Sequence, residues 1–77
     1  MNNTNLFSER LKTLRQQANL SQAELGNNIN LSKQTINDME HGRSKTTLDK
    51  AVLLADFFDV SLDFLTGRNS NPNSHKL

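Results

Sequence analysis

Apolar residues recur at helical spacing in two long stretches of this 77-residue chain. The first stretch carries them three or four positions apart, at Leu6, Phe7, Leu11, Leu14 and Ala18. This spacing predicts an amphipathic helix over roughly residues 6–18. The second stretch carries Leu48, Ala51, Val52, Leu54, Ala55 and Phe58. It is the most apolar segment, and we therefore expect a helix there that forms the centre of the core.

Two shorter helices between these stretches are marked by the residues that begin and end them. Ser21 and Glu24 have the spacing of a capping box, which predicts a helix that starts there and ends near residue 28 or 29. Ser32 can cap the next helix. That helix should stop at His41 and Gly42, because Gly readily adopts the left-handed conformation that follows a helix.

The C-terminal half carries similar signals. Thr46 or Thr47 can cap the apolar helix, and Ser61 opens a short fifth helix that Gly67 closes. Because β-branched and aromatic residues are sparse, we expect an all-α fold, a compact bundle of five helices.

One folded domain is expected over residues 6–67. It should follow a flexible N-terminus of residues 1–5. Residues 68–77 are polar, contain the only Pro and have nothing to bury, so we expect a disordered tail.

Composition argues against several classes of protein. The chain has no Cys, which excludes disulfides and thiolate metal sites and makes a reducing, cytoplasmic location the natural expectation. No apolar run approaches the ~18 to 20 residues of a membrane span, and no signal-peptide core is present. His41 and His75 are the only histidines, and no nucleophile-elbow or phosphate-loop motif occurs. We therefore expect no enzyme, no metal and no cofactor.

The net charge of +1 hides an asymmetry along the chain. Residues 1–45 carry a net +2, residues 46–67 carry −3, and the tail restores +2. A polyanionic partner would be expected to meet the first part and to avoid the second.

The connection between Ile29 and Ser32 leaves only two residues to reverse the chain. Asn30 is suited to this corner, because Asn tolerates the left-handed region better than other non-Gly residues. Gly26 inside the preceding helix costs roughly 1 kcal/mol relative to Ala, so we expect a packing reason, a close crossing of the two helices. Two short helices, a tight turn and a small residue at the crossing predict a helix-turn-helix over about residues 21–41.

Four segments of the sequence resemble the phage repressor and Cro-type helix-turn-helix family, also called the xenobiotic-response-element family. They are LSQAEL at 20–25, LSKQTIN at 31–37, MEHGR at 39–43 and VSLDFLTG at 60–67. The resemblance covers residues 6–67 and implies a lambda-repressor-like DNA-binding domain. The family usually has Ala where Gly26 stands and Gly where Asn30 stands; neither departure puts the fold in doubt.

The third helix presents polar side chains opposite Ile36 and Met39, as a helix that enters a major groove must. In the family, the positions that match Lys33, Gln34 and Asn37 commonly touch base edges, so the resemblance assigns base reading to these three.

Phosphate contacts position such a protein and do not specify sequence. We expect them from Gln22, Ser32, Arg43, Ser44 and Lys45. Thr35 either contacts phosphate or packs against the protein. Phosphates would repel Asp38 unless it accepts from cytosine or pairs with Lys33, and simple placement on the surface is the expected role.

Arg15 and Glu40 match a family pair in which an Arg of the first helix bonds a Glu at the end of the third. The resemblance implies a structural salt bridge that fixes how the third helix projects.

One such domain reads few base pairs, so we expect a homodimer, at least on DNA. The expected dimer surface comprises Phe57, Val60, Phe64 and Leu65. The alternative is that both Phe side chains sit in the core.

The leading functional hypothesis is a sequence-specific regulator of transcription that binds double-stranded DNA. The simplest form is a small Cro-like, prophage or plasmid repressor on a pseudo-palindromic operator, without contact with a membrane. One alternative is an antitoxin or antirepressor that acts through a protein partner. Another is non-specific nucleic-acid binding, which the near-neutral charge disfavours.

Overall fold

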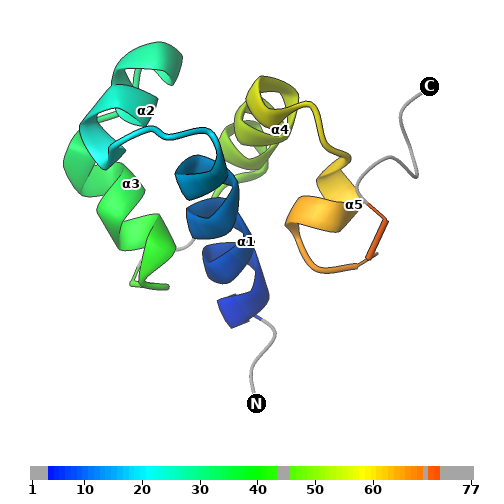
Figure 1. The fold of residues 1–77 in the computed structure, drawn as a ribbon. Helices are drawn as coiled ribbons and strands as arrows, with labels where there is room; N and C mark the ends of the chain where they lie inside the picture. Colours follow the sequence, from blue (N-terminus) through cyan, green and yellow to red (C-terminus); the bar gives the residue numbers. More distant parts are fainter. Residues whose placement is uncertain (1–3, 44–45, 69, 72–77) are drawn as a thin grey trace.

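The computed structural model describes residues 4–43, 46–68 and 70–71, and within these ranges the chain is helical without strands. Its helices are α1 (Thr4–Gln17), α2 (Gln22–Ile29), α3 (Lys33–Glu40), α4 (Leu48–Phe58) and α5 (Leu62–Leu65) (Figure 1). The all-α, five-helix fold that the sequence predicted is confirmed. The first helix begins two residues before the apolar pattern suggested.

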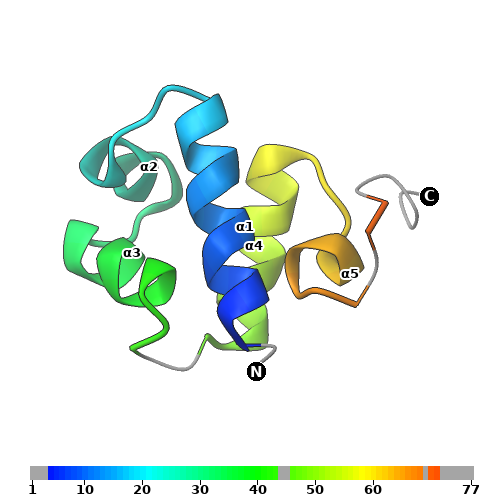
Figure 2. The ribbon, with the colours of Figure 1, turned by 60° about the horizontal axis from the view of Figure 1, so that its bottom comes forward.

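Helix α1 lies in the middle of the molecule, with α2 and α3 on one side and α5 on the other (Figures 1 and 2). Helix α2 packs against α3, and α4 packs against α5. The largest fully buried side chains come from all five helices: Leu11, Leu25, Ile36, Met39, Leu54 and Leu65. Among the described residues, no helix has the length and apolar character needed to cross a membrane.

The predicted helix starts are confirmed by the hydrogen bonds of their caps. The Ser21 hydroxyl accepts from the Glu24 amide at 3.0 Å, and the Glu24 carboxylate accepts from the Ser21 amide at 2.8 Å, which completes the capping box. Ser32 caps α3 and Ser61 caps α5 in the same way. Of the two Thr considered for α4, Thr47 is the cap.

The corner between α2 and α3 contains the left-handed residue that the sequence predicted. Asn30 has φ 63° and ψ 39°, and its N–H donates to the Gly26 carbonyl. A Cβ built on Gly26 would lie 2.3 Å from the Leu31 carbonyl oxygen. The packing reason for Gly26 is therefore the return of the turn backbone over α2, and the expected crossing of the third helix is not the nearest contact.

The apolar helix α4 is buried on one face only, which corrects part of the sequence prediction. Ala51, Leu54 and Ala55 are buried, but Leu48 is 68% exposed and Val52 is 40% exposed. A helix can turn only one stripe of side chains toward a core.

Candidate nucleic-acid interface

Helix α3 has a buried stripe and an exposed polar face. Ile36 and Met39 lie in the core, while Lys33 and Gln34 are exposed and Asn37 is half-buried. The three residues that the resemblance assigned to base reading thus lie away from the core, on the first turn and a half of one short helix. A helix N-terminus also carries free amides that favour an anion nearby.

Two residues at the start of α3 are already paired with each other. The hydroxyls of Ser32 and Thr35 are 2.8 Å apart, and the Ser32 hydroxyl also accepts from the Thr35 amide. Thr35 is half-buried. The Thr35 hydroxyl thus has a hydrogen-bond partner within the protein, the Ser32 hydroxyl that caps α3.

The end of α3 is fixed to α1 by the predicted salt bridge. Arg15 donates from Nε to Glu40 Oε2 at 2.6 Å and from Nη2 to Oε1 at 3.1 Å, a bidentate geometry that constrains orientation. A third donor of Arg15 bonds the Leu20 carbonyl at 2.7 Å. The hydrogen bond with Glu40 raises the pKa of the Arg15 guanidinium above its ordinary value, although burial opposes this shift.

A second link between α1 and α3 was missed by the sequence reasoning. The buried Ser8 hydroxyl donates to the Met39 carbonyl at 2.6 Å, which satisfies an acceptor near the end of α3. The available signal was spacing, because Ser8 stands three residues before Leu11 and seven before Arg15, on the same helical stripe.

Gln22 makes two hydrogen bonds within the protein, both with side chains of α3. It is half-buried, and its Nε2 donates to Glu40 Oε1 at 3.1 Å. Its Oε1 accepts from Asn37 Nδ2 at 3.3 Å. Gln22 therefore connects the ion pair beneath α3 with a side chain on its exposed face.

Asp38 pairs with Arg43, and no bond to Lys33 is among its interactions. Its Oδ1 accepts from Arg43 Nε at 3.3 Å and from Gln34 Nε2 at 2.9 Å. Arg43 also donates from Nη2 to Asn37 Oδ1. The Asp38 carboxylate thus hydrogen-bonds both Gln34 and Arg43 at the edge of the polar face. The sequence had suggested only that Asp38 lies on the surface.

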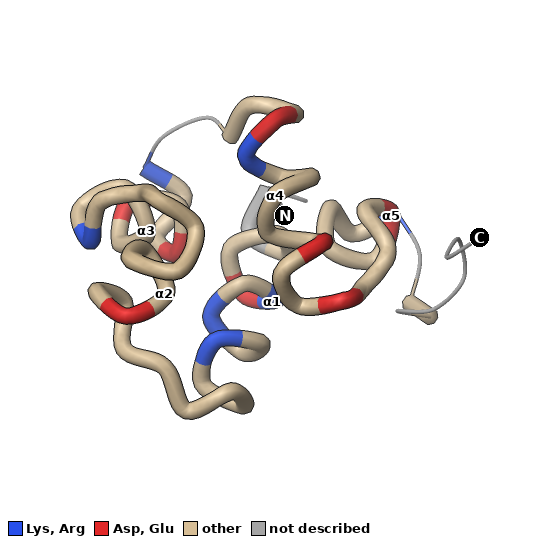
Figure 3. The backbone as a smooth tube through the Cα atoms, turned by 90° about the horizontal axis from the view of Figure 1, so that it is seen from above, with Lys and Arg blue, Asp and Glu red and all other residues tan. Residues whose placement is uncertain are grey.

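The remaining predicted contacts with phosphate divide into two groups. Ser44 and Lys45 lie outside the described residues. Gln22, Ser32 and Arg43 all border the polar face of α3. Acidic positions are also marked along α4 and α5, to the right of α2 and α3 in Figure 3, which agrees with the net negative charge of residues 46–67.

The predicted dimer surface is corrected by burial. Leu65 has no exposed surface, so it belongs to the core. The Arg10 guanidinium lies 4.2 Å from the centre of the Phe64 ring and covers it, and Val60 packs against the core. Of these four residues, only Phe57 is exposed, with 40% of its surface accessible to solvent.

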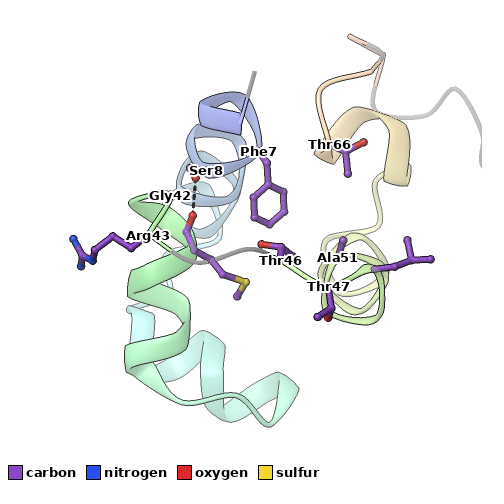
Figure 4. A pocket seen from close by; sticks show the side chains of 10 residues that line it. Phe7, Ser8, Gly42, Arg43, Thr46, Thr47, Ala51 and Thr66 are labelled. Carbon is purple, nitrogen blue, oxygen red and sulfur yellow. Dashed lines mark hydrogen bonds between the residues drawn. The ribbon is translucent and has the colours of Figure 1, made fainter. Parts of the chain in front are cut away.

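A cavity of about 620 Å³ lies beside the loop that follows α3. The Phe7 ring points into it, whereas the Arg43 side chain points away from it (Figure 4). Its other walls are mainly apolar side chains and Thr hydroxyls. Among the described residues, no group of three or more His, Cys, Asp or Glu side chains could hold a metal ion.

Comparison with known proteins places this geometry in a family. The sequence model of the helix-turn-helix family matches residues 11–65. An uncharacterized HTH-type transcriptional regulator of Bacillus subtilis, YobD, is 32% identical over 68 residues, which is 88% of this chain and 61% of the relative. The cryptic phage CTXphi transcriptional repressor RstR of Vibrio cholerae is 30% identical over 71 residues, or 92% of this chain and 63% of RstR. The chain therefore spans about three fifths of the length of these relatives.

The fold also matches a solved structure. The P22 c2 repressor, crystallised with synthetic operator 9T in the presence of Tl⁺, superposes with a TM-score of 0.77 at 23% identity. The match covers 83% of this chain and 97% of that one. The turn at Asn30, the capped α3 and the bridge from Arg15 to Glu40 agree with the motifs that carried the resemblance. The chain belongs to the helix-turn-helix family whose sequence model matches residues 11–65.

Proposed function

We propose that the protein is a sequence-specific transcriptional regulator that reads double-stranded DNA with α3 in the major groove. The observation that carries the proposal is the polar face of α3, which bears Lys33, Gln34 and Asn37 and is held from beneath by the Arg15–Glu40 pair. Lys can donate to guanine, and Gln and Asn can bond adenine through two atoms. Two related proteins support a repressor, because RstR is named one and the P22 c2 repressor was crystallised with an operator.

In this arrangement phosphates would meet the residues around α3. Gln22 and the free amides at the start of α2 would contact phosphates of one DNA strand. Arg43, Ser44 and Lys45, which follow α3 in the sequence, would contact phosphates near the C-terminal end of α3. Such contacts set register and orientation and contribute most of the salt dependence. We also propose that the folded domain comprises residues 6–67, extended by the first two residues of α1, and that residues 68–77 follow it as a tail.

The regulator would act as a homodimer on a pseudo-palindromic operator, in the cytoplasm, and as a binding protein without catalysis. A single copy covers few base pairs, whereas two copies one helical turn apart cover two half-sites. Of the four residues of the expected dimer surface, Phe57 is exposed, and it would contact the second copy.

Binding to DNA selected from a random duplex library tests the proposal. Gln34→Ala should lose about 1–3 kcal/mol on the preferred duplex and relax the preference at one base pair. Lys45→Ala should weaken all duplexes equally and reduce the slope of log affinity against log salt by about one. A wild-type protein that shows no preference over random DNA at physiological salt refutes the proposed function.

A further inference from the structure

A continuous chain of hydrogen bonds joins the ion pair beneath α3 to its exposed face. Its members in order are Arg15, Glu40, Gln22, Asn37 and Arg43. They come from α1, α2, α3 and the turn that follows α3. Gln22 and Asn37 stand in the middle, and each is bonded on both sides.

The two ends of this chain determine which atom of each amide points in which direction. A carboxylate only accepts hydrogen bonds, so Gln22 must turn its Nε2 toward Glu40 and its Oε1 toward Asn37. A guanidinium only donates, so Arg43 requires the Oδ1 of Asn37. Both ends therefore demand the same orientation of the Asn37 amide, with Nδ2 toward Gln22 and Oδ1 toward Arg43.

Asn37 retains hydrogen-bonding capacity in this orientation. Its Nδ2 has two hydrogens and gives one to Gln22, and its Oδ1 has two lone pairs and gives one to Arg43. One donor and one acceptor remain. Adenine offers the complementary acceptor N7 and donor N6 in the major groove, whereas guanine offers acceptors at both N7 and O6.

We propose that Gln22 is a positioning residue, which is anchored on Glu40 and holds the Asn37 amide in the orientation that prefers adenine over guanine. This inference rests on the proposed function, since Asn37 has to reach a base edge. An amide that is free to turn can move its oxygen away from guanine O6 and donate there instead. The fixed amide cannot do so, because the turn would bring its oxygen against the oxygen of Gln22 and its N–H groups against Arg43.

The substitution Gln22→Met separates positioning from contact with phosphate. Met has a similar length but neither donates to Glu40 nor accepts from Asn37, so the Asn37 amide becomes free to turn. Loss of a phosphate contact would weaken every duplex by the same factor. Loss of positioning would change the ratio between two duplexes. Gln16→Met is the matched control, because Gln16 is an exposed residue of α1 outside the hydrogen-bond chain.

The experiment uses duplexes selected from a random library by the wild-type protein. Asn37→Ala first identifies the base pair at which the preference disappears, and that pair is then changed from A·T to G·C. We expect wild type and Gln16→Met to prefer the A·T duplex by about tenfold to a hundredfold. Gln22→Met should reduce this preference to about threefold or less, and adding Gln22→Met to Asn37→Ala should not change the ratio further.

A second measurement on the protein without DNA keeps the inference independent of affinity. The side-chain NH₂ signals of Asn37 in an ¹⁵N spectrum should shift and gain mobility in Gln22→Met and should stay unchanged in Gln16→Met. A selected base pair that is not A·T overturns the inference. It is also overturned if Gln22→Met weakens both duplexes equally, and the proposed function then stands. If the wild-type protein shows no sequence preference, both the inference and the proposed function are wrong.

Discussion

Replacing Gly26 by Ala sets two effects of opposite sign against each other. Ala is the better helix former by about 1 kcal/mol, and Gly26 lies within the helical span of α2. On helix propensity alone, Gly26→Ala would stabilise the protein. The structure around this residue predicts the reverse.

The added methyl group would meet backbone that cannot easily move. Its carbon would lie 2.3 Å from the Leu31 carbonyl oxygen, about 1 Å short of ordinary contact. Leu31 is held there because its N–H donates to the Gly26 carbonyl at 2.8 Å. Overpacking typically costs about 1–3 kcal/mol, and weakening this hydrogen bond costs about 1 kcal/mol more. The net expectation for Gly26→Ala is a loss of about 1–3 kcal/mol in the free energy of unfolding.

Urea denaturation followed by far-ultraviolet circular dichroism measures this loss, since the chain has no Trp or Tyr for fluorescence. The matched control is Asn27→Ala, at the adjacent exposed position of α2, which should gain a few tenths of a kcal/mol from propensity. If Gly26→Ala is as stable as wild type, or gains stability like the control, the reasoning from the close contact is wrong.

The residue at the corner offers a further check on the same mechanism. Asn30 is left-handed at φ 63°, and Gly at this position would let the turn shift away from an Ala at position 26. We expect Asn30→Gly alone to change stability by less than about 1 kcal/mol. The double variant should recover about 1 kcal/mol relative to the sum of the single changes. Strict additivity would show that the two positions are not coupled.

Three further variants test other contacts. Glu40→Ala leaves the Arg15 guanidinium largely buried without its carboxylate, so urea denaturation should show a loss of about 3 kcal/mol, and an unchanged midpoint would contradict this. Arg10→Met keeps the side-chain stem but loses both the stacking on the Phe64 ring and the hydrogen bond to its carbonyl; the expected loss is about 1–2 kcal/mol, with DNA affinity unchanged. Phe57→Ser removes an exposed ring with an edge contact to its neighbour and should cost about 1 kcal/mol. It should also weaken dimer formation on the operator in sedimentation experiments, and an unchanged dimer would place the interface elsewhere.

The sequence by itself determined the local features of the fold. Ser21, Ser32 and Ser61 were recognisable as caps, because a cap is a bond between a side chain and an amide three residues later. Asn30 could be assigned to the left-handed corner for a similar reason, since the preference belongs to the residue type. The same rule, applied more widely, would have found Asn19 and Asp59, which are also left-handed.

The sequence also contained part of the candidate site, through its motifs. The bridge between Arg15 and Glu40 followed from the resemblance, and it is present with two bonds. Spacing on α3 was sufficient to separate the buried Ile36 and Met39 from the polar face, because helical periodicity fixes which residues share a side.

Only the tertiary structure decided which face of each helix meets which neighbour. Periodicity could not tell that Leu48 is exposed while Leu54 is buried, because both are apolar residues of one helix and burial depends on what packs against it. Leu65 and Phe64 were assigned to a dimer surface, yet the first is core and Arg10 of α1 covers the second.

The hydrogen bonds from Gln22 to Glu40 and from Asn37 to Gln22 were equally out of reach. They span 18 and 15 positions in sequence and exist because the turn at Asn30 brings the start of α2 beside the end of α3. A side chain's own chemistry shows that it can donate and accept, but the partner is chosen by the crossing of helices. The sequence predicted DNA contacts for Gln22, Asn37 and Arg43 separately. The tertiary structure shows that hydrogen bonds connect these three side chains.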